Sequence, residues 1–283
     1  MMRWAVAAVS ALVVFTSAGG VARAADAPGG EVGPGVPKFQ VRPGYRVTLA
    51  ADKLDNARSL EVDDNGTLYV ADNKGGTITS LRDKDGDGTF ETRAEFVGEF
   101  PTVHGMCWHD GWLWFTQSGA VYKARDADGD RVADDVEPVI PEGTLPRGGG
   151  HWWRSILVAA DGKTFYTSIG DSGNTNDETA TDRQKIWRFN ADGSGKQLFA
   201  SGLRNTEKLR FRPGTTEVWG VDHGSDNYGL KVGERPGNQP VTDGNPPCEF
   251  NHTSRASSTA TRSSPATSSR GWSSWTSRTS STG

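Results

Sequence analysis

Two stretches of this sequence carry side chains that could perform chemistry, and the first runs from Gly150 to Asn174. His151 comes just before an apolar run, and Asp171 follows the next one. If these runs pair as antiparallel strands, the return of the chain brings Asp171 back toward His151. A neutral histidine with a carboxylate nearby is a competent general base, so this pair could remove a proton from a substrate. The alternative is an ordinary exposed histidine in a loop.

The second stretch runs from Ser201 to Tyr228, and within it Arg204 and Asn205 precede another alternating segment. An arginine fork can hold a carboxylate or a quinone oxygen. The loop that begins at Asp222 offers carboxylates and turn carbonyls, which are the oxygen ligands that Ca²⁺ prefers. The alternative is a single arginine paired with a neighbouring carboxylate beside a polar turn.

Two aspartate-rich loops have the opening spacing of an EF-hand calcium loop. The six aspartates are Asp83, Asp85, Asp87, Asp126, Asp128 and Asp130. The first loop has Ala94 at the twelfth position, and the second has Glu137 there but Arg131 where glycine is expected. Long flanking helices are not expected at either loop, so neither is an EF-hand. We expect a structural Ca²⁺ ion at these hairpins, with a plain Asx-turn as the alternative.

The elements that must position these residues follow a loose repeat. Four segments, 58–71, 103–116, 154–168 and 208–221, each alternate apolar and polar residues around an Asn-Gly, Asp-Gly or Pro-Gly turn. The first three are followed by a further short strand, at 77–81, 120–123 and 185–189. The copies recur about every 50 residues, which is typical of a propeller blade. The sequence therefore predicts an all-β, six-bladed-type β-propeller that is incomplete, with about four blades in residues 43–252. His151 and Arg204 would then lie at the mouth of its central channel.

The N-terminal residues 1–24 have the pattern of a signal peptide. Arg3 supplies a positive charge, an apolar run follows from Ala5 to Phe15, and Ala22 and Ala24 form a small-x-small cleavage site. The apolar run is too short for a membrane anchor, and we expect no membrane span in the mature chain. The predicted location is periplasmic or secreted. Residues 25–42 are expected to be a flexible leader.

The C-terminal residues 253–283 consist almost entirely of Ser, Thr, Arg, Ala, Pro, Gly and Trp. This composition predicts a disordered Ser/Thr-rich tail, and a shifted reading frame would explain it. A closed ring would need roughly two further blades. We therefore expect the chain as written to be impaired as an enzyme.

Charge and cysteine content narrow the function classes further. The formal net charge is −4 and there is no basic block, so nucleic acid is not an expected partner. The two cysteines are Cys107 and Cys248, and Cys107 lies in an apolar run. A buried thiol at Cys107 is the main expectation, with a Cys107–Cys248 disulfide as the alternative. No CxxCH motif is present, so no covalently attached haem is expected.

Residues 43–252 resemble the glucose/sorbosone dehydrogenases that use pyrroloquinoline quinone (PQQ), and they look closest to a sorbosone-dehydrogenase-like branch. The motifs that carry the resemblance are His151 with 166–171 (Tyr-Thr-Ser-Ile-Gly-Asp), and 202–205 (Gly-Leu-Arg-Asn) with 223–224 (His-Gly). The resemblance implies oxidation of an aldose or related sugar at the anomeric carbon, with hydride transfer to PQQ. It does not indicate which sugar reacts or which partner accepts the electrons.

The resemblance also implies roles for individual residues. His151 would be the base, oriented by Asp171, and Arg204 and Asn205 would hold the quinone face of the cofactor. The carbonyls of Gly224 and Ser225 would ligate a Ca²⁺ ion that polarises PQQ. The sequence departs from the family at Thr206 and Ser225, where proline is common, and basic cofactor-binding residues from later blades are absent.

Two other functions compete with this reading. One is a non-catalytic secreted propeller that binds a glycan or a protein partner through aromatic residues such as Trp152. The other is a metal-dependent lactonase on a similar propeller. A lactonase needs a cluster of Glu, Asp and Asn ligands at the channel bottom, which the sequence does not supply.

Overall fold

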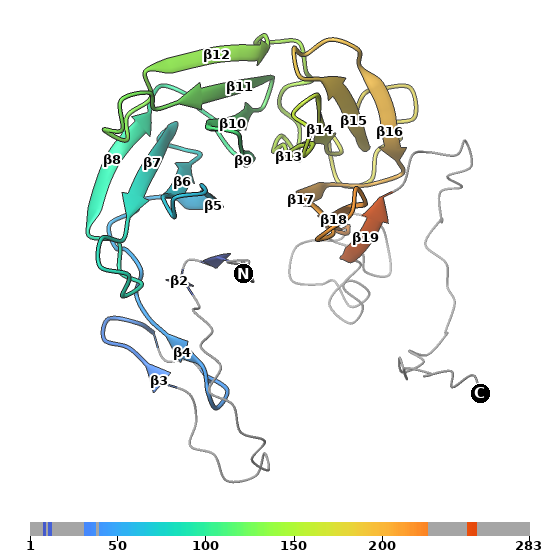
Figure 1. The fold of residues 1–283 in the computed structure, drawn as a ribbon. Coiled ribbons are helices and arrows are strands. Elements are labelled where there is room, and N and C mark those ends of the chain that lie inside the picture. The colour runs from blue at the N-terminus through green and yellow to red at the C-terminus, as the bar shows by residue number, and fades with distance from the viewer. Residues whose placement is uncertain (1–7, 10, 13–30, 38–39, 226–247, 254–283) are drawn as a thin grey trace, which may run out of the picture.

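The computed structural model describes residues 8–9, 11–12, 31–37, 40–225 and 248–253. In this part of the chain every regular element is a strand, and four antiparallel sheets lie side by side along an arc (Figure 1). The all-β fold and the four propeller blades predicted from the sequence are therefore confirmed. The cleavage site at Ala22–Ala24 and the tail from residue 254 lie outside the described residues, so the signal peptide and the disordered tail stay predictions.

Each sheet is an up-and-down meander whose strands pair with their neighbours in the chain. Sheet one holds β5 (Ala57–Val62), β6 (Leu68–Asp72), β7 (Thr77–Arg82) and β8 (Thr92–Val97). Sheet two holds β9 (Met106–His109), β10 (Trp112–Gln117), β11 (Ala120–Arg125) and β12 (Asp135–Ile140). Sheet three holds β13 (Ile156–Val158), β14 (Thr164–Ile169), β15 (Lys185–Asn190) and β16 (Gln197–Ser201). The described part of sheet four holds β17 (Thr206–Phe211), β18 (Val218–Asp222) and β19 (Glu249–Thr253).

Two short strand pairs lie outside the blades. β1 (Ala8–Val9) pairs with β2 (Ala11–Leu12) in antiparallel fashion. β3 (Glu31–Val32) pairs in parallel with β4 (Arg46–Val47). β3 falls inside the segment that the sequence analysis expected to be a flexible leader, so that segment contains a paired strand.

The inner hairpins form where the sequence signals them. In the turn between β9 and β10, Asp110 has φ 46° and Gly111 has φ 81°. Positive φ at both central residues is the geometry of a type I′ turn, which matches the twist of the flanking strands. The outermost strands β8, β12 and β16 were not predicted. Buried residues occur only near their C-terminal ends, so they lack a continuous apolar alternation.

The hydrophobic core lies between neighbouring sheets. Trp114 of sheet two and Phe165 of sheet three have ring centroids 5.5 Å apart, and Phe165 stacks on Phe189 at 5.3 Å. Tyr69 of sheet one stacks on Trp108 of sheet two at 5.8 Å. Because each blade buries its faces against the next one, blade packing fixes where the inner strands stand.

The strands β5, β9, β13 and β17 form the inner side of the arc (Figure 1). Polar contacts join sheet four directly to sheet one, because Lys208 Nζ donates to Ser59 Oγ at 3.1 Å. Arg210 and Glu61 form a salt bridge of 2.6 Å between the same two sheets. These two contacts thus hold the inner strands β5 and β17 together.

The two cysteines do not form a disulfide. Cys107 is a buried free thiol and Cys248 is an exposed one, which confirms the main expectation for Cys107. Burial, followed by the charge of Glu61, raises the pKa of Cys107 to about 11. The thiol is therefore a packing group at neutral pH. None of the described segments is an apolar helix of membrane-spanning length.

Candidate active site

His151 lies half-buried just ahead of the inner strand β13. Its backbone nitrogen donates to the carbonyl oxygen of Asp171 at 3.2 Å, and its Nδ1 lies 3.2 Å from the same oxygen. A carbonyl oxygen only accepts, so Nδ1 carries the proton and Nε2 carries the lone pair. This tautomer can accept a proton at Nε2.

The antiparallel return brings Asp171 to His151, but through its main chain. The sequence analysis expected the carboxylate to orient the imidazole. The buried carboxylate instead accepts hydrogen bonds from Gly173 N at 2.6 Å and Asn176 N at 3.0 Å. It also accepts one from Gln184 Nε2. Asp171 therefore shapes the loop that follows it and presents its carbonyl oxygen to His151.

Two arginines that the sequence analysis did not single out hold the segment that carries His151. Arg154 is fully buried and donates to the carbonyls of His151 at 3.1 Å and Trp153 at 2.8 Å. Arg183 donates to the carbonyls of Arg147 and Gly148 at 2.9 and 3.1 Å. Burial and the nearby charge of Arg183 lower the pKa of Arg154 to about 9. The only sequence signal for either residue is its position two residues before a strand, Arg154 before β13 and Arg183 before β15.

The side chains of Asn205 and His151 both lie against Gly170. A Cβ atom on Gly170 would lie 2.6 Å from Asn205 Oδ1 and 2.6 Å from His151 Cβ. The backbone of Asn205 is held by Asp222, whose carboxylate accepts from Asn205 N at 2.8 Å and from Arg204 N at 3.0 Å. The fold thus brings together His151 and Asn205, which lie 54 positions apart in the sequence. They are two of the predicted site residues.

Arg204 acts as a clamp between two loops. Its Nε donates to the carbonyl of Asn174 at 2.7 Å, and its NH2 group donates to Asn174 Oδ1 at 2.8 Å. Its NH1 group donates to the carbonyls of His223 at 3.0 Å and Gly224 at 2.5 Å. The guanidinium therefore ties the loop after Asp171 to the loop after β18.

This clamp bears on the expected calcium ligands. Gly224 and Ser225 are half-buried, and the carbonyl oxygen of Gly224 accepts from the Arg204 guanidinium. Two cations at one carbonyl oxygen repel each other. A Ca²⁺ ion held by Gly224 and Ser225 would therefore have to displace the Arg204 guanidinium from the carbonyl of Gly224.

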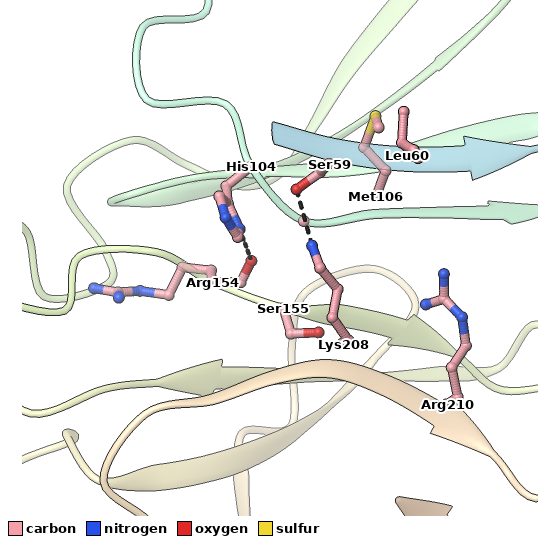
Figure 2. Close-up of a pocket in the computed structure, with 9 residues that line it drawn as sticks. Ser59, Leu60, His104, Met106, Arg154, Ser155, Lys208 and Arg210 are labelled. Atoms are coloured by element: carbon pink, nitrogen blue, oxygen red, sulfur yellow. Dashed lines mark hydrogen bonds between the residues drawn. The ribbon is translucent and has the colours of Figure 1, made fainter. Parts of the chain in front are cut away.

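The inner strands enclose a small pocket (Figure 2). Ser59, His104, Ser155 and Lys208 contribute to its lining. His104 is 2% exposed, and its Nδ1 lies 3.2 Å from the carbonyl oxygen of Arg154. Its ring stacks on Trp153 with a centroid distance of 5.1 Å. Burial, and then the charge of Lys208, lower the pKa of His104 to about 3.

The buried His104 predicts a specific acid sensitivity. Its folded pKa lies below the unfolded value near 6.5, so its stabilising effect is present above about pH 6.5 and is lost as pH falls toward 3. We expect this one residue to cost roughly 2 kcal/mol of unfolding free energy between about pH 7.5 and 5. Urea unfolding at both pH values should show that loss in the wild type, with a smaller loss in His104→Asn. His252→Asn, at an exposed histidine on β19, is the matched control and should keep the full loss. An equal pH dependence in His104→Asn and the wild type would contradict the assignment.

The two aspartate loops bring their carboxylates together. The first groups Asp83, Asp85, Asp87 and also Glu91, and the second groups Asp126, Asp128 and Asp130, each with ligand atoms within 4.8 Å of one another. The two loops have matching backbones, since Arg131 adopts φ 75° where the first loop has Gly88 at φ 92°. Arg131 therefore adopts the left-handed backbone conformation that glycine has at the same position of the first loop. Each loop also forms Asx-turn bonds, such as Gly86 N to Asp83 Oδ1 at 2.7 Å. Calcium binding at the loops stays a prediction.

Solved structures with the same fold include several sugar dehydrogenases. The holo form of the pyranose dehydrogenase PQQ domain from Coprinopsis cinerea has a TM-score of 0.62 and 18% identity, covering 72% of this chain and 53% of that one. A calcium structure of a family AA12 carbohydrate-active enzyme from Trichoderma reesei has a TM-score of 0.60 and 18% identity, covering 74% and 55%. The PQQ-bound aldose sugar dehydrogenase from Streptomyces coelicolor has a TM-score of 0.51 and 18% identity, covering 73% and 62%.

The chain thus spans just over half the length of the first two of these structures. At this level of identity, the likeness defines the class of fold, a β-propeller of the kind found in sugar dehydrogenases. A comparison with curated proteins found no match. The profile of the TrAA12-like family matches residues 39–272, which is most of the chain. The chain therefore belongs to the TrAA12-like family, and the family resemblance read from the sequence is confirmed.

Proposed function

We propose that this protein is a PQQ-dependent sugar oxidoreductase. It would oxidise an aldose or related sugar at the anomeric carbon. The observation that carries the proposal is that His151 and Asn205 both lie against Gly170. His151 precedes the inner strand β13, and Asn205 precedes the inner strand β17. The TrAA12-like match and the sugar dehydrogenases among the structures of similar fold support it. An imidazole base and an amide at one place suit a polyhydroxylated substrate.

His151 would perform the proton transfer. When bound, PQQ supplies a two-electron acceptor for the hydride on the anomeric carbon. His151 would take the proton of the anomeric hydroxyl at Nε2, while the carbonyl of Asp171 holds Nδ1–H. Loss of one hydride and one proton turns the cyclic sugar into its lactone.

The charges around this site fit an anionic quinone. Arg154 and Arg183 lie close enough to lower the pKa of Arg154, and the bonds described for both guanidiniums go to carbonyl oxygens. The carboxylate of Glu178 lies near Arg183 and offsets part of this charge, since Arg183 helps to lower the Glu178 pKa. The remaining positive charge favours an anion nearby, and PQQ carries three carboxylates. The half-buried indole of Trp152, next to His151, adds an aromatic face. Because both guanidiniums are buried and bonded to protein carbonyls, they would act on the cofactor through their charge, with Arg204 positioning the surrounding loops.

Three further features belong to the proposal. A Ca²⁺ ion is proposed at Gly224 and Ser225, once Arg204 releases the carbonyl of Gly224 and keeps its bonds to Asn174 and His223. The two aspartate loops are proposed as structural Ca²⁺ sites. Secretion or export to the periplasm is also proposed, on the signal-peptide pattern of residues 1–24. The electron acceptor is left open.

A PQQ titration in the presence and absence of Ca²⁺ tests the proposal. We expect saturable binding at one site, followed by reduction of an artificial electron acceptor when an aldose is added. A folded protein that binds glycans but neither binds PQQ nor oxidises an aldose would instead be the non-catalytic propeller considered above.

A further inference from the structure

The side-chain ammonium of Lys185 lies inside a cage of main-chain carbonyl oxygens. Lys185 is the first residue of β15, and its Nζ reaches back to the loop that precedes this strand. Four carbonyl oxygens of that loop surround Nζ, those of Glu178 at 2.9 Å, Thr179 at 3.4 Å, Thr181 at 2.5 Å and Arg183 at 3.1 Å. An ammonium has three N–H groups, so it cannot give each oxygen a hydrogen bond of its own. It therefore fills the cage chiefly as a central positive charge.

The donor set of this cage is that of a monovalent-cation site. Proteins bind K⁺ with clusters of backbone carbonyl oxygens, which replace the hydration shell of the ion. An ammonium group has the same charge as K⁺ and nearly the same size. Burial lowers the pKa of Lys185, and the carboxylates of Asp182 and Glu178 oppose this effect. Both the carbonyl dipoles and the nearby carboxylates thus favour a cation in the cage.

The loop that forms the cage also supports the segment that carries His151. The carboxylate of Glu178 accepts a hydrogen bond from Ser172 N at 3.1 Å, and the carbonyl of Ser172 accepts one from Gly150 N at 2.6 Å. Arg183, the last member of the cage, donates through its guanidinium to main-chain carbonyls of the same segment. The first and last residues of the cage are therefore connected to the backbone beside His151.

We propose that Lys185 is a tethered cation that fills a monovalent-cation cage and thereby holds the loop of residues 171–184 against His151. Removal of the ammonium would leave carbonyl oxygens facing one another, and these repel unless a cation takes its place. Thr179 and Thr181 are exposed, so a free K⁺ or NH₄⁺ ion can reach the emptied cage from solvent. The role toward His151 rests on the proposed function, whereas cation binding by the cage does not.

The test follows the order of this loop in Lys185→Ala. Hydrogen exchange of residues 171–184 and the melting temperature are measured in KCl, NH₄Cl and tetramethylammonium chloride at equal ionic strength. Tetramethylammonium is too large for the cage, so in its chloride the loop of the variant should exchange about tenfold or more faster than in the wild type. KCl and NH₄Cl should restore both quantities toward the wild-type values. The wild type should behave alike in all three salts, because its cage is already filled.

Lys196→Ala is the matched control. Lys196 is exposed and contacts the same loop through the carboxylate of Asp182, so its removal should not make the loop respond selectively to K⁺ or NH₄⁺. If Lys185→Ala does not fold, Lys185→Met, which keeps most of the apolar stem, is taken through the same salts. An undisturbed loop in Lys185→Ala would overturn the inference. The absence of a selective rescue by K⁺ or NH₄⁺ in both Lys185 variants would also overturn it.

The kcat for aldose oxidation, measured in the same salts, separates the cage from the proposed function. In Lys185→Ala this rate should fall and recover together with the order of the loop. Recovered loop order without a recovered rate, in the presence of an active wild type, would overturn the role toward His151. If the wild type oxidises no aldose, the proposed function fails, while a selective rescue seen by hydrogen exchange would still support the cage.

Discussion

His151→Ala is expected to lower kcat for aldose oxidation by about 10²–10⁴-fold, the usual cost of losing a general base. The side chain is half-buried and makes its Nδ1 contact with a main-chain carbonyl. The neighbouring carbonyls are held by Arg154 and Arg183 in either case. The variant should therefore stay folded and keep its affinity for PQQ, because the loss falls on proton transfer.

Steady-state rates, PQQ affinity and melting temperature on His151→Ala check this result. His252→Ala, at the exposed histidine of β19, is the matched control and should keep the wild-type rate. A His151→Ala protein with an unchanged kcat would move the base to another residue. Such a result would also mean that the proximity of His151 and Asn205 has no role in catalysis.

Arg204→Ala is expected to lower the unfolding free energy by roughly 3 kcal/mol, because charge-assisted hydrogen bonds to Asn174, His223 and Gly224 are lost together. The carbonyls of these residues would lose their cationic donor. The two loops beside His151 would no longer be tied to each other, so PQQ affinity and kcat should fall as well. Lys at this position keeps the charge but not the planar fork, so it cannot reach both loops at once.

The Arg204→Lys variant separates a clamp from a direct contact with the cofactor. If Arg204 acts as a clamp, lysine should lose melting temperature and PQQ affinity together, in proportion to each other. If the guanidinium touches the quinone, lysine should keep its melting temperature and lose single-turnover rate. Arg212→Lys, at an exposed arginine in the turn between β17 and β18, is the control and should change neither quantity. A fully stable Arg204→Ala variant would contradict the clamp.

The parts of the fold that follow local rules could be predicted from the sequence. The turn at Asp110 and Gly111 and the strands around it have the alternation and the turn residues that a hairpin requires. The outer strand β12 could not be predicted, because half of its residues face solvent and it carries a proline at Pro138. Its place is set by pairing with β11, which is a contact between chain segments and leaves little trace in the local pattern.

The sequence was enough to predict which residues form the site, but not which of their atoms make the contacts. Strand pairing was enough to bring Asp171 back to His151, yet whether a carboxylate or a carbonyl makes the contact depends on the loop that follows. Arg154 was not selected, since a buried charge at the end of an inner strand is recognised only when its partners are known. The carbonyl cage around Lys185 is likewise invisible to a period-two pattern.

The most direct test of the central claim is a single-turnover measurement on the PQQ-loaded protein. The loaded protein is mixed with an aldose and with the same aldose deuterated at the anomeric carbon, and the absorbance of the bound quinone is followed. The account predicts that the aldose reduces the bound PQQ and that deuteration slows this step severalfold, because the anomeric C–H bond breaks in it. PQQ that is bound with Ca²⁺ present but is not reduced by any aldose would contradict the assignment of this site to sugar oxidation.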